Sequence, residues 1–575
     1  MGREAFAPLA MCAAIGIFLG VGKLQDLHQQ GWPWWALITG VLLAASAGAG
    51  LGWWMWRTVR HTSAKQKLTD VRALDDYTGK GAAEKGRGLR SSLTDTKNVE
   101  MHELAARMGR VGRTTLWKSW EDVCLVFMGP RSNKTSAIAV PTVLSAPGAV
   151  VATSNKPDLW MLTAGLRSRV GRVFTFDPFA IAYVPQTWWW NPLADVDEPE
   201  DAQKLAGHFV STVDAGNNRD IWGPAAKSLL GQLFLAAAVS GRCLRDSLNW
   251  LYTGSDEPIG ILERSGHLLE AAKLATTLEG AAETRSGFVL TASEAVSCLT
   301  SEKVLRWVTP PSTWRTPPKA GEKIEELDLW QFVTPREDGQ YPTLYLLTQE
   351  GAGTAGPVVA ALVDRLFRIS KQAASAMGGR LDPVLTAMLD EAANICRIAD
   401  LPAYYSWFGS VGVSVTTLLQ SYAQGEGVWG KTGMETLYSA STLNIVGAGT
   451  KDVHFARTLS TSIGEHLVKR NTDSYGPGGS SRSVAQVREP IMPVDEIINL
   501  VRTKAIWHVT GHRPVLMKLL PWYRENDRDE ISSTNADALE QVRIAAVEAL
   551  GSANPVARHL SDAIPVNAAE VEKAL

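Results

Sequence analysis

The feature that most constrains the fold is a short apolar run that stops at a turn and passes at once into a helical pattern. The run is Val123–Met128 (VCLVFM), the turn begins at Gly129 and Pro130, and the helical pattern starts at Lys134. An apolar run of this length that contains β-formers and is bounded by Gly and Pro is typical of a buried strand. A buried strand that leads directly into a helix predicts an α/β fold.

The same alternation continues on both sides of the middle of the chain. Stretches with helical spacing, such as 357–369, separate short apolar runs that we interpret as strands. These runs are 149–153, 173–176, 343–348, 384–389, 413–419, 442–448 and 505–510. Strands that alternate with helices predict a parallel sheet covered on both faces.

The middle of the chain lacks strand signals and predicts a separate helical domain. Apolar residues spaced three and four apart indicate helices at 201–213, 225–238, 260–278 and 284–301. We therefore predict an all-α domain at 195–323. It would interrupt a single α/β domain made of residues 116–194 and 324–522.

The N-terminal segment, 1–56, contains two uncharged stretches that predict a membrane anchor. They cover residues 5–22 and 34–56, and a bilayer requires about 20 apolar residues per helix. Trp residues flank the second stretch, and basic residues follow it: Arg57, Arg60, Lys65 and Lys67. The positive-inside rule then places both the N-terminus and the large C-terminal part in the cytoplasm, at the inner (cytoplasmic) membrane. A signal peptide is the alternative for the first stretch, but no convincing cleavage site precedes Lys23.

The residues outside these domains carry weaker signals. Residues 57–115 are charged and polar and are interpreted as a linker, 471–487 as a mobile Gly/Ser-rich loop, and 523–575 as a C-terminal tail.

The net charge of −2 gives no global basic field for nucleic acid, so any contact with DNA requires a local patch or a channel. The five cysteines form no CxxC pair, which favours free thiols in a reducing compartment.

The turn after the first strand has the composition of a phosphate-binding loop. Such a loop needs backbone N–H groups at a helix N-terminus, a Lys for the β- and γ-phosphates and a Ser or Thr for Mg²⁺. Either the loop is one residue shorter than the usual pattern, or Met128 replaces its first Gly. Asn133 stands where the second Gly is expected. Asn tolerates the left-handed conformation well, so the loop can still form. The candidate nucleotide-binding residues are Gly129, Pro130, Arg131, Ser132, Asn133, Lys134, Thr135 and Ser136.

Two later strands end in residues that suit ATP hydrolysis. The run 384–391 (VLTAMLDE) ends in Asp390, a candidate Mg²⁺ ligand together with Thr135, and Glu391, a candidate for polarising the attacking water. Carboxylates at the C-terminal end of a strand lie where open α/β sheets bind ligands. Gln420 follows the next strand and could sense the γ-phosphate. The simpler alternatives are a helix N-cap for the acidic pair and a surface side chain for Gln420.

These motifs, with others in the same order, resemble the TraG-like coupling proteins of type IV secretion systems, a family of hexameric ATPases. The resemblance covers roughly residues 1–520. The matching segments are 129–144, 147–160, 176–179, 191–193, 221–230, 389–395, 418–424, 447–465 and 488–497.

The resemblance implies a RecA-like P-loop domain interrupted by an all-α domain, two N-terminal spans, and a hexamer around a channel. Family members receive a relaxase-bound DNA strand and pass it to the secretion channel. If the roles of the matching family residues apply here, Lys134 and Thr135 would bind phosphate and Mg²⁺, and Asp390 would coordinate Mg²⁺. Glu391 would be the catalytic base, and Gln420 would sense the γ-phosphate.

The sequence departs from the family in two places. Asn133 replaces a Gly, and the Arg that often stands about eleven residues before the motif Gln is missing, since that position is Gly409. Arg397 or Arg457 could substitute. These departures motivate the alternative of a catalytically weak membrane receptor that recruits cargo. An FtsK-like DNA translocase or a protein-secretion ATPase is a further alternative, although we find one P-loop and no winged-helix-like tail.

Two smaller features each have two interpretations. The run Trp188–Trp190 could stack on nucleobases, but packing at a domain junction is the preferred interpretation. Arg482 and Arg488 could line a DNA channel or belong to a solvated loop.

Overall fold

The computed structural model describes residues 31, 33, 68, 70–93, 99–211, 222–336, 338–351, 353–476 and 479–563. The chain divides into two compact units, Met1–Lys67 and Leu68–Leu575, and every described element belongs to the second. The predicted spans at 5–22 and 34–56 lie outside the described residues. Among the described helices, none is both long enough and apolar enough to cross a membrane.

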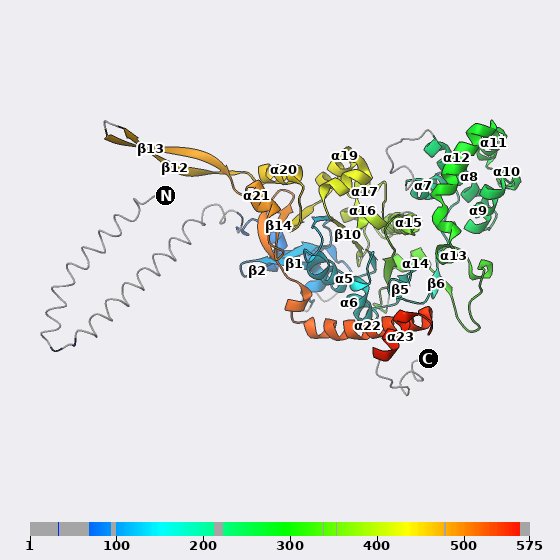
Figure 1. Cartoon of the computed structure of the whole chain (residues 1–575), viewed down its shortest axis with the longest axis horizontal. Coiled ribbons are helices and arrows are strands. Elements are labelled where there is room, and N and C mark those ends of the chain that lie inside the picture. The colour runs from blue at the N-terminus through cyan, green and yellow to red at the C-terminus, as the bar shows by residue number, and fades with distance from the viewer. Residues whose placement is uncertain are drawn as a thin grey trace. The chain divides into compact units, whose positions relative to one another are not determined.

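A mixed sheet, eleven-stranded within the described residues, is the centre of the second unit (Figure 1). Its strands, in spatial order, are β2 (Thr114–Ser119), β1 (Ala105–Val111), β15 (Val515–Leu519), β14 (Lys504–Val509), β11 (Leu443–Gly447), β3 (Cys124–Phe127), β10 (Val413–Leu419), β9 (Leu385–Leu389), β4 (Val150–Ser154), β8 (Thr343–Leu347) and β5 (Val173–Phe176). All eight predicted strands are present in this sheet, so the α/β class is confirmed.

The prediction of a wholly parallel sheet is wrong. The strands from β11 to β5 run parallel, whereas β14, β15, β1 and β2 pair antiparallel. For two of the four antiparallel pairs in the described sheet, the reason is the length of the connections. Antiparallel neighbours need only a short turn, whereas parallel neighbours need a crossover of a dozen or more residues. Only short turns separate β1 from β2 and β14 from β15.

Residues 57–115 are not simply a linker, because their C-terminal end forms β1 and the start of β2 in the sheet. This region contains η2 (Asp75–Tyr77), α3 (Gly79–Leu89), α4 (Met101–Leu104) and β1. At its start, the carbonyl of Leu68 accepts a hydrogen bond from the backbone N–H of Leu516 in β15 (2.8 Å). Arg107, Gly109 and Arg110 interrupt the apolar pattern of β1, which is why the strand escaped prediction.

Helices cover both faces of the sheet, as predicted. In β3, Leu125 and Phe127 join one apolar core, and Cys124, Val126 and Met128 join the other. Figure 1 shows α15 and α19 over the first face and α5, α6 and α22 over the second. The helices of this part are η3 (Thr135–Ala139), α5 (Val140–Leu144), α6 (Asp158–Arg167), α15 (Gly356–Ala376), α16 (Ala392–Ile395), α17 (Leu401–Tyr404), α18 (Phe408–Val411), α19 (Tyr422–Ala440), α20 (Val453–Ile463), α21 (Val494–Ile498), η6 (Trp522–Arg524), α22 (Arg528–Leu550) and α23 (Pro555–Ala563).

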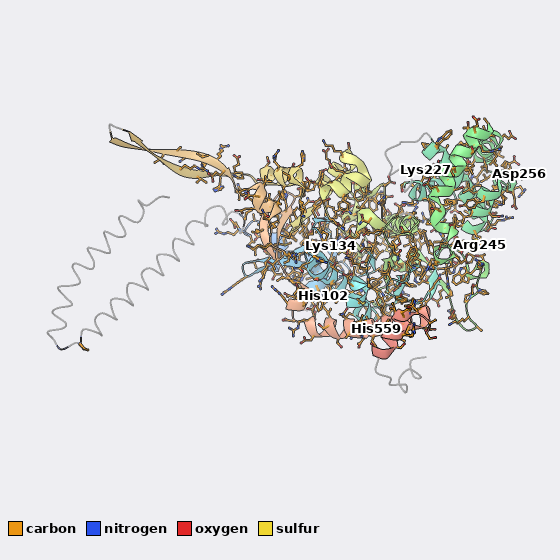
Figure 2. The ribbon with its side chains drawn as sticks, viewed as in Figure 1. His102, Lys134, Lys227, Arg245, Asp256 and His559 are labelled. Atoms are coloured by element: carbon orange, nitrogen blue, oxygen red, sulfur yellow. The ribbon has the colours of Figure 1, made fainter. Side chains whose placement is uncertain are left out.

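The helical middle of the chain is present and is built around α8. Its helices are α7 (Pro199–Val210), α8 (Trp222–Val239), α9 (Leu244–Thr253), α10 (Glu257–Arg264), α11 (Leu268–Glu279), α12 (Ala282–Ala295), η4 (Ser297–Thr300), α13 (Glu302–Leu305), η5 (Pro311–Thr313) and α14 (Leu329–Val333). The predicted helix 260–278 is two helices, because the chain turns at Gly266 with φ 86°. Two short paired strands, β6 (Trp188–Trp189) and β7 (Glu325–Glu326), connect this middle to the sheet. Figure 2 shows Arg245 and Asp256 within it, away from Lys134.

The tryptophan run packs at this junction and is not available to nucleobases. Trp188 is 1% exposed and lies edge-on to Phe174 and Trp307. Trp189 and Trp190 are also buried.

The predicted mobile loop at 471–487 is instead a β-ribbon. Strands β12 (Glu465–Gly476) and β13 (Gly479–Pro490) pair antiparallel along their whole length, and Figure 1 shows the ribbon extending away from the sheet. The sequence of the ribbon lacks the apolar alternation that identifies a half-buried strand, and for this reason the ribbon escaped prediction. The C-terminal tail also differs from expectation, since Ile531 and Ala538 of α22 belong to the second core and α22 packs on α6.

Candidate nucleotide-binding site

The loop that leaves β3 has the backbone shape of an anion-binding turn. Arg131 and Asn133 adopt positive φ angles of 57° and 71°, and Lys134 returns to the right-handed helical region. The backbone N–H groups of Arg131, Ser132 and Asn133 have no hydrogen-bond acceptor within the described part of the chain. Successive N–H groups in alternating left- and right-handed conformations form a concave site for anions.

Two contacts hold this loop in place. Gly129 lies against the next loop, where an added Cβ would come within 2.6 Å of the carbonyl oxygen of Gly449, so only glycine fits there. The side chain of Asn133 donates from Nδ2 to the carbonyl of Arg502 (3.1 Å) and accepts from the Tyr523 hydroxyl (3.5 Å). Asn133 therefore supplies the left-handed conformation expected of this position and adds an anchor that glycine lacks.

The helix that follows the loop begins with a π-helical turn, Thr135–Ala139, and continues as α5. Pro141 lies just after this turn. Proline lacks an N–H group, and its ring would clash with the carbonyl four residues earlier in a regular α-helix. The wider π turn accommodates it. Thr135 and Ser136 lie in this first turn, directly after Lys134.

The acidic pair lies beside Lys134. The Lys134 Nζ is 3.3 Å from Asp390 Oδ1 and forms a closer ion pair with Glu391. Burial lowers the pKa of Lys134, but these two carboxylates outweigh that effect and the net pKa is raised. Burial raises the pKa of Asp390 to about 6, with the negative charges of Glu391 and Asp158 adding to the effect and Lys134 opposing it.

Gln420 completes the group from the neighbouring strand. Its Nε2 donates to Glu391 Oε2 (2.9 Å), and Glu391 itself has a φ of 54° directly after β9. Parallel neighbours β3, β10 and β9 therefore bring Lys134, Gln420 and the acidic pair together at their C-terminal ends. Glu391 is the N-cap residue of α16, but its side chain makes no capping hydrogen bond and instead contacts Lys134 and Gln420. Gln420 is partly buried and is therefore not a free surface side chain.

Two amide side chains that the sequence analysis missed extend this network. Asn394 Nδ2 donates to Glu391 Oε2 (3.2 Å), and Gln424 Nε2 donates to Asn394 Oδ1 (2.8 Å). Gln424 Oε1 accepts from the backbone N–H of Gln420 (2.9 Å). Their spacing of three residues after Glu391 and four after Gln420 is the helical spacing that places side chains together, and this signal could have identified them.

An arginine from a different segment lies beside Gly409. Arg380 donates from Nη1 to the carbonyl of Gly409 (2.6 Å), while its Nε and Nη2 are buried without a hydrogen-bond partner in the described residues. The two alternatives lie elsewhere: Arg457 is exposed on α20, and Arg397 faces a cavity beside the helical middle of the chain.

The structure thus defines an α/β protein with a helical insertion and, after β3, a loop with the backbone shape of an anion-binding turn. Two family models match the chain. One, "Type IV secretory system Conjugative DNA transfer", matches residues 80–308, and the other, "TraM recognition site of TraD and TraG", matches residues 384–502. Together they cover more than half of the sequence. The chain belongs to the TraG/TraD family of type IV secretion coupling proteins.

Individual relatives agree with this assignment. Two conjugal transfer proteins TraG of Escherichia coli are 22% and 23% identical over 420 and 423 residues. Each alignment covers 65% of this chain, which spans 61% of the length of each relative.

Solved structures share the fold. The unbound monoclinic form of the bacterial conjugative coupling protein TrwBdeltaN70 matches with a TM-score of 0.53 and 18% identity, covering 76% of this chain and 91% of that chain. The complex of TrwB with ADP and Mg²⁺ matches with a TM-score of 0.51 and 18% identity, covering 70% of this chain and 85% of that chain.

Proposed function

We propose that this chain is a membrane-anchored ATPase that couples relaxase-bound, single-stranded DNA to a type IV secretion channel and drives its transfer by ATP hydrolysis. The observation that carries the proposal is the meeting of Lys134, Asp390, Glu391 and Gln420 at the ends of three adjacent parallel strands. The match to a family model for conjugative DNA transfer supports DNA as the transported molecule.

The residues present suit ATP and Mg²⁺. Mg²⁺ keeps several waters and is usually held by one or two protein ligands together with substrate phosphates. Thr135 and Asp390 provide such a set, and among the described residues no group of three or more His, Cys, Asp and Glu could hold a metal alone. Bound ATP and Mg²⁺ would supply the reacting phosphoanhydride and the cation that neutralises its developing charge.

The network of side chains suggests separate roles for Lys134, which would bind the phosphates, and Glu391, which would act as the base. When Lys134 turns to the phosphates, Glu391 loses its ion pair and is free to accept a proton from the attacking water. Gln420 stays within hydrogen-bond distance of Glu391 and would orient the same water. The backbone N–H groups of residues 131–133 would hold the phosphate oxygens.

The partners follow from the family. We expect a homo-hexamer, attached to the inner membrane by the stretches 5–22 and 34–56, with the large part in the cytoplasm. It would contact the channel proteins and DNA with its bound relaxase. The match of residues 384–502 to a TraM recognition site favours a TraM-type accessory protein as a further partner.

We assign Arg380 as the arginine that serves a neighbouring subunit. Its contact with Gly409, the position where the family arginine is expected, supports this assignment. Its Nε and Nη2 have no partner among the described residues and are buried in the single chain, so the side chain would have to turn outward to reach a phosphate of a neighbouring subunit. An unpaired buried guanidinium is costly, so a ligand that pairs with it gains binding energy.

The test is ATP turnover by the full-length protein in detergent, with and without single-stranded DNA. We expect DNA-stimulated turnover in the wild type and its loss in Lys134→Ala, because the β- and γ-phosphates lose their cationic partner. The matched control is Lys303→Ala, which removes an exposed lysine of α13 and should retain full turnover. Absence of DNA-stimulated hydrolysis, or full activity of Lys134→Ala, would favour the alternative of a catalytically weak receptor.

A further inference from the structure

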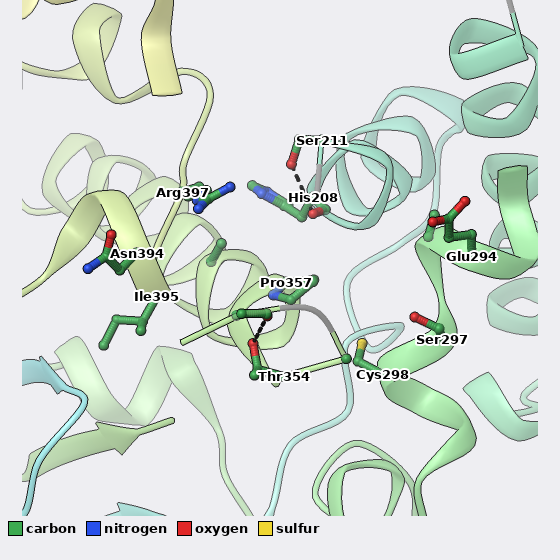
Figure 3. Close-up of a pocket in the computed structure, with 15 residues that line it drawn as sticks. His208, Ser211, Glu294, Ser297, Cys298, Thr354, Pro357, Asn394, Ile395 and Arg397 are labelled. Carbon is green, nitrogen blue, oxygen red and sulfur yellow. Dashed lines mark hydrogen bonds between the residues drawn. The ribbon is translucent and has the colours of Figure 1, made fainter. Parts of the chain in front are cut away.

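A cavity of about 330 Å³ lies between the helical middle of the chain and the α/β part. One wall comes from α7, α12 and η4, and the other from the loop after β8, the start of α15 and the segment around α16 (Figure 3). It is separate from the loop at 129–135, and none of the proposed nucleotide-binding residues lines it.

Two side chains capable of positive charge face each other in this cavity. Figure 3 shows Arg397 and His208 directed toward one another. Arg397 donates from Nε to the carbonyl of Ala393 (2.8 Å), and its two terminal amino groups have no partner among the described residues. The His208 side chain is 9% exposed, with Nε2 held 3.2 Å from Asp364 Oδ2, while Nδ1 has no partner in the described part of the chain.

Beside these side chains, the cavity is lined by the backbone of a glycine-containing loop. Gly351 and Gly353 have positive φ angles of 108° and 70°, and the loop they form leads into the 21-residue helix α15. Thr354 donates to the carbonyl of Gly351 (2.8 Å), which fixes the loop. A long helix presents the positive end of its dipole at the N-terminus, and glycines allow a ligand to approach the backbone closely.

From this combination we infer that the cavity binds a phosphate group. His208 would bind it from the wall of α7, and Arg397 and the N-terminus of α15 would bind it from the other wall, through charge-assisted hydrogen bonds to the anion. Glu294, on the same wall as His208, would repel a second anion and accept hydrogen bonds from the rest of a larger ligand. The phosphate can belong to a free ligand or to the backbone of a DNA strand.

This site touches the proposed catalytic network through one residue. Asn394 lines the cavity and also donates to Glu391 (3.2 Å). A phosphate bound beside Asn394 would therefore lie one side chain away from the proposed base. The binding itself does not depend on ATP hydrolysis, so it can be tested in a chain that cannot turn over ATP.

The test is calorimetric titration of the full-length Lys134→Ala protein, in which the nucleotide site is weakened. The ligands are inorganic phosphate and a short oligo-dT. Two variants in this background probe the cavity: Arg397→Gln removes a cation, and Ser297→Glu adds a negative charge at an exposed position of the wall. Arg264→Gln, at an exposed position of α10, is the matched control. Thermal unfolding of each variant checks that it is folded.

We expect both cavity variants to weaken binding at least tenfold, which corresponds to about 1.4 kcal/mol, and the control to leave it unchanged. A loss for inorganic phosphate identifies a free phosphate ligand, and a loss for oligo-dT alone identifies the DNA backbone. Binding of both ligands that is insensitive to Arg397→Gln and Ser297→Glu, or no binding of either, would overturn the inference. Failure of the proposed ATPase would appear separately, as absent turnover in the wild type.

Discussion

The parallel and antiparallel strands of the sheet differ in what they hold. The parallel strands are buried on both faces, and the C-terminal ends of three of them carry Lys134, Gln420 and the acidic pair. The antiparallel strands carry none of these groups. Instead they bind the segments before and after the sheet: β15 forms a backbone hydrogen bond with Leu68, and Arg107 of β1 forms an ion pair with Glu525 (2.7 Å). One sheet thus contains parallel strands that position the candidate site residues and antiparallel strands that attach the flanking segments.

The first prediction concerns the two ends of the parallel strands. Gln420 lies at the C-terminal end of β10, whereas Arg380 lies beside Gly409, before β10 begins. If Arg380 serves a neighbouring subunit, Arg380→Ala should lower kcat by roughly 10³ and leave ATP affinity nearly unchanged, as expected for an arginine finger. Arg380→Lys, which retains the positive charge, is the matched comparison.

Mixed assemblies test whether Arg380 acts between subunits. Chains carrying Lys134→Ala and chains carrying Arg380→Ala should each be inactive alone, and mixing them should restore part of the turnover. Mixtures that remain as inactive as the separate variants would show that Arg380 does not act across an interface.

The second prediction concerns the proposed base. Glu391→Gln keeps the shape of the side chain but cannot accept a proton, so kcat should fall by roughly 10² to 10³. ATP binding, followed with a fluorescent analogue, should be retained or tightened, because Lys134 loses a competing carboxylate. Asp529→Asn, at an exposed position of α22, is a control that should behave as wild type. An active Glu391→Gln protein would remove Glu391 from the mechanism.

The third prediction compares the two parts of the sheet directly. Leu389 ends β9 beside Asp390, and Leu519 ends β15, and both are buried. Replacing either by Ala should lower the free energy of unfolding by about 2–5 kcal/mol. Only Leu389→Ala should also lower kcat, by roughly tenfold, because it supports the strand end that positions the acidic pair. Equal kcat values for the two folded variants would contradict the division of roles.

The smallest effect is expected at Asn133. Asn133→Gly relieves the left-handed strain but loses the hydrogen bond to Arg502, and each effect is worth about 1 kcal/mol. The two should nearly cancel, so kcat and ATP affinity should change by less than about threefold. A gain of tenfold or more would show that Asn133 limits the wild-type rate.

The sequence predicted the parallel strands well and the antiparallel strands poorly, for a physical reason. Strands such as Leu385–Leu389 are buried on both faces and appear as continuous apolar runs. The antiparallel β1 contains Arg107, Gly109 and Arg110, and the sequences of β12 and β13 are rich in polar residues, so neither has that signature. Strand composition also does not reveal orientation, which for β1 with β2 and β14 with β15 follows from their short connections.

The candidate site was predictable where a motif sits at a strand end. Lys134, Asp390, Glu391 and Gln420 were found in this way and lie together in the structure. Arg380 was missed because its contact with Gly409 joins segments that are 29 residues apart. The cavity lined by Arg397 and His208 was missed for the same reason, since it forms only when α7 and the segment after Glu391 approach each other.

The bond between Leu68 and Leu516 has a mechanical consequence. Leu68 is the first residue of the unit, so a pull on the proposed membrane anchor would enter the sheet at β15. Between β15 and β3 lie β14 and β11, and each junction is a ladder of backbone hydrogen bonds. Tension from the membrane would thus be spread over these ladders before it reached the phosphate-binding loop, and the loop could keep its shape while the protein works under load.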